Sequence, residues 1–139
     1  MASTEIEATE KWLFDTLAGD AVGVGDRVYS EVAPPDSAYP FVVFQHQGGR
    51  DVAGVGPSRI MYSSLWLVKA VDRSPSLTTV GPIARLIDSL LQGKNGANQY
   101  GKVLACAREQ AFRMTEVDEG KFYVHLGGQF RIFAQAVSA

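Results

Sequence analysis

The sequence predicts an α+β fold in which a single, mostly antiparallel β-sheet carries two helices on one face. Three observations predict it: a helical apolar stripe near the start of the chain, a second one past its middle, and several segments rich in β-forming residues. Their order is helix, short strand, two strands, helix, two strands, and a two-layer sandwich buries both stripes economically. The 139 residues fit one domain, residues 1–139.

The first predicted element is a helix that begins near Thr4 and stops near Gly19. The segment Thr4–Glu7 matches a capping box, in which threonine and glutamate side chains satisfy free backbone N–H groups. Its apolar side chains share one stripe that is expected to pack on the sheet: Ile6, Leu13 and Leu17, widened by Trp12 and Phe14.

The first hairpin is predicted to project from the body as an arm. After a short strand at 27–30, Phe41–Gln47 reads as a central strand, and Ser58–Asp72 reads as a long one. A strand of that length spans roughly 50 Å, whereas a globule of this size is roughly 37 Å across. The strand must therefore bend, bulge or project. The connection Gly48–Pro57 holds four glycines, which predicts a flexible loop at the tip of the arm.

The second half of the chain predicts a helix and a closing hairpin. The helix is expected from about Pro82 to Gln92, after a loose first turn, and residues 93–98 are expected to form a loop. Lys102–Met114 is predicted to pair with Phe122–Val137 through a turn at 117–120. Within the last strand, Gly127-Gly128 indicates a bulge or a close backbone contact.

Composition excludes several classes of function. The net charge of −2 and the pI of about 5.6 argue against a broad basic surface for nucleic acid. A single cysteine excludes an intramolecular disulfide and a cysteine-rich zinc site. No apolar run approaches the roughly 20 residues of a membrane span, and the polar start Met1–Glu5 is unlike a signal peptide. These features predict a protein made in a reducing cytoplasm.

The residues that could carry chemistry form no convincing site. Cys106 could be a nucleophile activated by His46 or His125, but its alanine neighbours in a strand favour a small buried hydrophobe. Two histidines without a carboxylate at ligand spacing make a poor metal site. The glycine segments 23–25 and 54–56 lack the further residues of a phosphate-binding loop and are typical of turns. We therefore expect no catalytic residue, cofactor or metal.

Charge is divided unevenly along the chain. Residues 1–51 carry three basic and nine acidic side chains, whereas residues 52–139 carry ten basic and six acidic ones. Chance distribution over a solvated surface is one interpretation. The other is a polar subunit whose acidic and basic faces meet head to tail in a ring.

The order of several short segments resembles the tail-terminator, or tail-completion, proteins of long-tailed phages. The segments are Gly25-Asp26-Arg27-Val28-Tyr29, Ala33-Pro34, Tyr39-Pro40-Phe41-Val42-Val43, the long strand Ser58–Asp72 before a helix, and His125-Leu126-Gly127-Gly128 followed by Phe130-Arg131-Ile132. The resemblance covers roughly residues 6–134. Gly81-Pro82 in the second helix departs from the family pattern.

The resemblance implies a structural virion protein without catalysis or a cofactor. Such a protein forms a hexameric ring on the last ring of the major tail tube protein, ends tube polymerisation and offers a surface to the head–tail connector. DNA passes through its central hole without sequence recognition. It would be assembled in the host cytoplasm and reside in the virion tail, with no membrane partner. The alternatives are a head-side connector or stopper protein, and a small ligand-binding or enzymatic domain.

The arm and the strand after it supply the candidate contacts with a neighbouring subunit or the tube. The candidate interface residues are Arg50, Asp51, Arg59, Tyr62 and Trp66. A long strand with apolar residues on both faces needs a partner to cover it.

Overall fold

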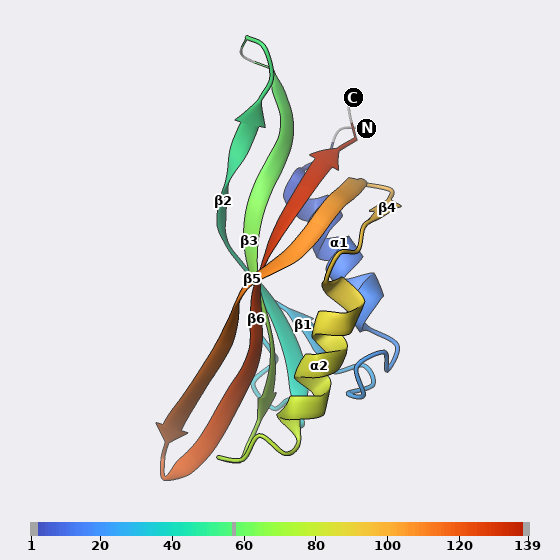
Figure 1. The fold of residues 1–139 in the computed structure, drawn as a ribbon. Coiled ribbons are helices and arrows are strands. Elements are labelled where there is room, and N and C mark those ends of the chain that lie inside the picture. Colours follow the sequence, from blue (N-terminus) through green and yellow to red (C-terminus); the bar gives the residue numbers. More distant parts are fainter. Residues whose placement is uncertain (1–2, 57, 138–139) are drawn as a thin grey trace.

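A computed structural model of the chain describes residues 3–56 and 58–137. Within that part, two helices and six strands follow one another as α1 (Glu5–Leu17), β1 (Val28–Ser30), β2 (Phe41–Ala53), β3 (Arg59–Asp72), α2 (Val80–Leu91), β4 (Gly96–Asn98), β5 (Gly101–Asp118) and β6 (Lys121–Ala136). The strands form one sheet in the order β1-β2-β3-β6-β5-β4, and both helices lie on the same side of it (Figure 1). The predicted α+β fold is confirmed.

The sheet is antiparallel except at β1, which runs parallel to β2. One row across its four long strands serves as a reference: His46 of β2 pairs with Trp66 of β3, Trp66 with Phe130 of β6, and Phe130 with Arg108 of β5. We call it the central row. The sheet face under α1 and α2 is called the helix face, and the opposite one the outer face.

The main core lies between the helices and the helix face. It includes Leu13 and Leu17 of α1, Ile87 and Leu91 of α2, and a line of strand residues, all buried: Val42, Phe44, Trp66, Val68, Phe130 and Ile132. A smaller cluster on the outer face joins Phe41, Val43 and Val71 to Tyr29 and Ala33. β2 and β3 therefore carry buried apolar residues on both faces at the end opposite the tip of their hairpin.

Helix α1 has the predicted capping box, because Thr4 Oγ1 accepts from Glu7 N while Glu7 Oε1 accepts from Thr4 N. Its buried face differs from the predicted stripe. Ile6 and Phe14 are 38% and 46% exposed, since the buried face follows residues 5, 8, 9, 12, 13 and 17 instead. Ile6 and Phe14 flank that face and contribute little to the core.

Helix α2 begins at Val80, two residues before the predicted start. Gly81 N donates to Leu77 O at 2.8 Å, and Pro82 falls in the first turn, where its missing N–H would have no helical partner. The proline therefore fits inside the helix rather than opening it. The predicted loop at 93–98 also contains the short strand β4, which pairs with the start of β5.

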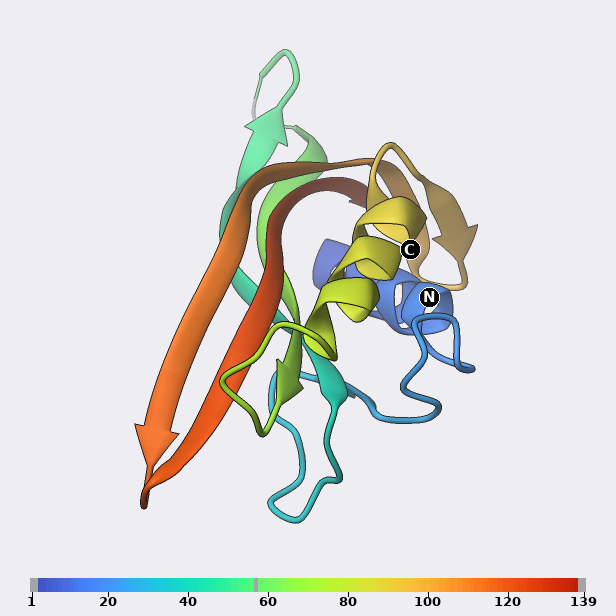
Figure 2. The ribbon, with the colours of Figure 1, turned by 60° about the horizontal axis from the view of Figure 1, so that its bottom comes forward.

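Two hairpins, not one, project from the body, and their tips point to opposite ends of the molecule (Figure 1). The predicted arm is the β2–β3 hairpin. Most of its expected glycine loop is strand, because β2 continues to Ala53 through a bulge between His46 and Gly49. Pro57, at the end of the expected loop, lies outside the described residues. The sequence predicted that β5 and β6 pair with each other. It did not predict that their hairpin extends past the end of β3. Figure 2 shows β5 and β6 curling over the helices at the β4 end.

Of the two alternatives predicted for Gly127-Gly128, a bulge or a close backbone contact, the close contact is present. A Cβ atom on Gly127 would lie 2.0 Å from Val68 O. The nearby register shift is in β5, between Arg108 and Gln110, which pair with Phe130 and Gln129 of β6. Two of the register shifts in the sheet, between His46 and Gly49 in β2 and between Arg108 and Gln110 in β5, therefore adjoin the central row.

Candidate assembly surface

The two outer edges of the sheet are covered only over part of their length. On one side, β1 pairs with β2 from Val42 to Phe44, and the Glu31 carboxylate then accepts from His46 N at 2.8 Å. On the other side, β4 pairs with β5 only up to Val103. Gly93 N at the end of α2 donates to Cys106 O at 2.8 Å, and Gln92 Oε1 accepts from Arg108 N at 2.8 Å. On both edges, the pairing with neighbouring elements thus ends at the central row. There a side chain, Glu31 on one edge and Gln92 on the other, accepts the last outward backbone N–H.

Beyond these two side chains each edge strand is bare on its outer side. We call Gln47–Ala53 the β2 free edge and Glu109–Asp118 the β5 free edge. Among the described residues, no strand pairs with the outer side of either segment, and no backbone hydrogen bond reaches it from another element. Rows of unpaired N–H and C=O groups on an edge strand are a ready template for pairing with another chain. Each free edge spans at least about 20 Å.

Three of the five candidate interface residues lie on the surface of the β2–β3 hairpin. Arg50 and Asp51 belong to the β2 free edge, and both are exposed. Arg59 opens β3 and forms ion pairs with Glu5 of α1 at 3.1 Å and with Asp51 at 3.7 Å. Arg59 therefore ties the hairpin to α1, and its role towards a partner stays a prediction.

The other two candidates face the interior to different degrees. Tyr62 is half-buried, its ring stacks on His46, and its hydroxyl lies 3.1 Å from His46 Nε2. Trp66 is only 1% exposed and its Nε1 donates to Ser64 Oγ at 2.8 Å inside the core. Trp66 cannot contact a partner unless the subunit unfolds, so its contribution is to the core of the subunit.

The sequence did not point to the β5 free edge. Its basic side chain lies on the helix face of the sheet, and its acidic side chains lie on the outer face. Arg113 lies on the helix face, as its pairing with Leu126 shows, and so does Arg108 just before the free edge, which pairs with Phe130. Glu109, Glu116 and Asp118 follow the outer face, where Glu109 meets Arg131 at 3.0 Å. The length and alternation of the last two strands are the only sequence signals that could have revealed this edge.

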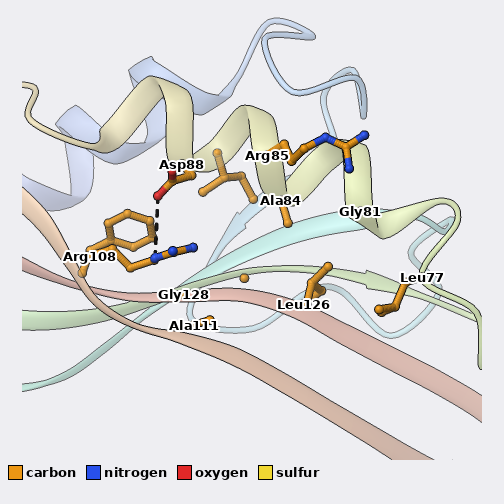
Figure 3. A pocket seen from close by; sticks show the side chains of 12 residues that line it. Leu77, Gly81, Ala84, Arg85, Asp88, Arg108, Ala111, Leu126 and Gly128 are labelled. Carbon is orange, nitrogen blue, oxygen red and sulfur yellow. Dashed lines mark ion pairs between the residues drawn. The ribbon is translucent and has the colours of Figure 1, made fainter.

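An apolar groove of about 630 Å³ lies between α2 and the base of the β5–β6 hairpin. Its floor and walls are mostly small or aliphatic, including Gly81, Ala84, Ala111 and Gly128 (Figure 3). Asp88 and Arg108 face each other across its end at 3.8 Å, and both are well exposed. Arg85 is the other charged side chain that lines the groove, besides this solvated ion pair.

The outer face carries a buried polar cluster near the β5–β6 hairpin. His125 is 7% exposed, and its Nε2 lies 2.7 Å from Glu116 Oε1. Burial lowers the pKa of His125, and the Glu116 carboxylate opposes this only in part. Lys69 is 8% exposed with its Nζ 5.6 Å from the centre of the Phe112 ring, and burial lowers its pKa too.

The residues considered for nucleophilic or metal chemistry are not brought together. Cys106 is 2% exposed, as predicted, and burial raises the pKa of its thiol to about 12, which disfavours the nucleophilic thiolate. His46 bonds to Tyr62 and His125 to Glu116. No group of three or more metal-ligating side chains gathers anywhere in the described ranges. None of the helices in the described part of the chain is long and apolar enough to cross a membrane.

The fold defines a small α+β domain whose single sheet ends in two half-covered edges. It is similar to a chain in the virion of a native gene transfer agent particle, with a TM-score of 0.66 and 12% sequence identity. The match covers 94% of this chain and 98% of the other. The sequence matches no protein-family model. No curated protein matches it either.

Proposed function

We propose that this chain is a structural protein of a phage-like virion. The observation that carries the proposal is the fold shared with a chain of a gene transfer agent virion over nearly the full length of both chains. The proposal assigns the chain no catalysis and no cofactor.

The specific role we propose is that of a tail terminator. The chain caps the tail tube as a ring of six copies, ends tube polymerisation and provides the tail-side surface for head–tail joining. Its partners are further copies of itself, the major tail tube protein and the connector of the filled head, and DNA passes through the lumen without sequence recognition. This role is supported by the order of sequence segments that resembles the terminator family, and by two free sheet edges suited to assembly.

Deletion of the gene with plasmid complementation tests this role. We expect the deletion to leave filled heads beside unjoined tails of uncontrolled length, and the plasmid to restore joined particles. Tails of normal length beside heads that lose their DNA would favour a head-side stopper instead. Normal, infectious particles from the deletion strain would contradict a structural role in the virion.

A further inference from the structure

We propose that neighbouring subunits join edge to edge, with the β5 free edge of one copy pairing with the β2 free edge of the next. The sheet then continues from subunit to subunit around the ring. This inference rests on the proposed function, which supplies the ring. It adds the surface through which neighbouring copies contact each other. Its basis is that the same sheet ends on both sides in a bare strand, Gln47–Ala53 on one and Glu109–Asp118 on the other.

Strand direction favours this pairing. β2 runs antiparallel to β3, β3 to β6, and β6 to β5, so β5 runs opposite to β2. Copies related by rotation about a ring axis keep these directions when the axis follows the strands. β5 of one copy therefore meets β2 of the next as an antiparallel pair, which is the arrangement of every other long pair in this sheet.

The positions of the free edges fix the offset between copies. The β2 free edge lies beyond the central row towards the tip of the β2–β3 hairpin, and the β5 free edge lies beyond it towards the opposite tip (Figure 1). Each copy must therefore shift along its neighbour's strands before the two bare segments coincide. In a closed sheet such a stagger corresponds to strands tilted from the axis, and closed barrels require a tilt of this kind. The opposed tips thus suit a closed ring.

Charge on each face selects which edges meet. On the helix face the β2 free edge carries Asp51, which pairs with Tyr62 in the sheet, and the β5 free edge carries Arg113. On the outer face the signs are reversed, with Arg50 on β2 and Glu116 and Asp118 on β5. Pairing β2 with β5 brings opposite charges together on both faces. Cross-strand pairs of opposite charge stabilise a sheet, and like charges directly opposite destabilise it.

The same charges disfavour a two-fold dimer. Joining two β2 free edges would place Asp51 near its own copy on the helix face and Arg50 near its own copy on the outer face. Joining two β5 free edges would bring together two copies of Arg113. The head-to-tail contact avoids both conflicts, and a head-to-tail contact generates a ring when its rotation closes.

Charge reversal tests the pairing in assembled particles. We expect Arg113→Glu to reduce ring formation on tail tubes at least about tenfold, because it sets two acids against each other. Asp51→Arg should do the same, and the double variant should recover most of the loss. Lys94→Glu is the matched control, since Lys94 is exposed in the loop before β4 and belongs to neither free edge. The melting temperature of each variant establishes that it is folded.

Cross-linking gives a second readout that does not depend on weakening the ring. In a Cys106→Ala background, Asp51→Cys combined with Arg113→Cys should yield a ladder of covalent oligomers when joined particles are treated with a short bismaleimide. Lys94→Cys combined with Arg113→Cys should not.

The outcomes separate this inference from the function on which it rests. Rings on tail tubes that neither cross-link through 51 and 113 nor respond to charge reversal would overturn edge pairing and leave the terminator role standing. If the parent protein forms no ring on tubes, the proposed function fails and edge pairing fails with it. A ladder together with rescue by the double reversal establishes the pairing.

Discussion

Gly127→Ala is expected to destabilise the fold through a single added methyl group. The new Cβ would lie 2.0 Å from Val68 O and 2.6 Å from Lys69 Cα, whereas ordinary contacts of a Cβ begin at 3.4 Å. Both obstacles are backbone, so β3 and β6 would have to part by more than 1 Å at the centre of the sheet. Overpacking of this kind costs about 3 kcal/mol, of which reduced unfolded-state entropy returns less than about 1 kcal/mol.

The neighbouring glycine supplies the control. A Cβ on Gly128 would meet Arg108 Cδ at 2.7 Å and Gln110 O at 3.2 Å, and the arginine side chain can swing away. We expect Gly128→Ala to cost about 1 kcal/mol or less. Urea unfolding followed by circular dichroism and by the fluorescence of buried Trp66 measures both free energies. Equal costs for the two variants, or a Gly127→Ala cost below about 1 kcal/mol, would refute the reasoning.

Three further predictions use the same protein. Cys106→Ala should cost about 1 kcal/mol in the free energy of unfolding, because it removes one small buried group, and the native thiol should resist alkylation until the chain unfolds. Because burial lowers the pKa of His125 from its ordinary 6.5, its neutral form favours folding. Stability should be full above about pH 6.5 and fall as the pH drops through the lower folded-state pKa, and His125→Gln should flatten this dependence in urea titrations at several pH values. Self-association measured by light scattering should weaken from low salt to molar salt, since screening shortens the reach of exposed charges, and an equally tight assembly would point to an apolar contact.

Local sequence signals predicted the elements that depend on neighbouring residues. The capping box at Thr4–Glu7 is one case, and the pairing of the last two strands through a tight turn is another. Gly127 was predicted to mark either a bulge or a close backbone contact, since a glycine inside a strand often marks one of the two, and the close contact is present. In each case the deciding contact lies within a few residues along the chain or in the adjacent strand.

Features set by distant contacts were missed or misplaced. The connection Gly48–Pro57 reads as a loop in the sequence, yet residues 48–53 belong to β2 because they pair with β3. A register shift between His46 and Gly49 accommodates them. Trp66 was assigned to an interface because alternation shows which residues share a face but not which face the helices cover. The β5 free edge was not foreseen, since the sheet order and the extent of β5 that β4 and α2 cover depend on non-local packing.

Electron microscopy of the purified protein mixed with tail tubes tests the central claim most directly. We predict a single ring of six copies at one end of each tube, with tube growth halted at that end and filled heads able to attach there. Tubes that keep growing at both ends, with the protein absent from them or scattered along their walls, would contradict the account.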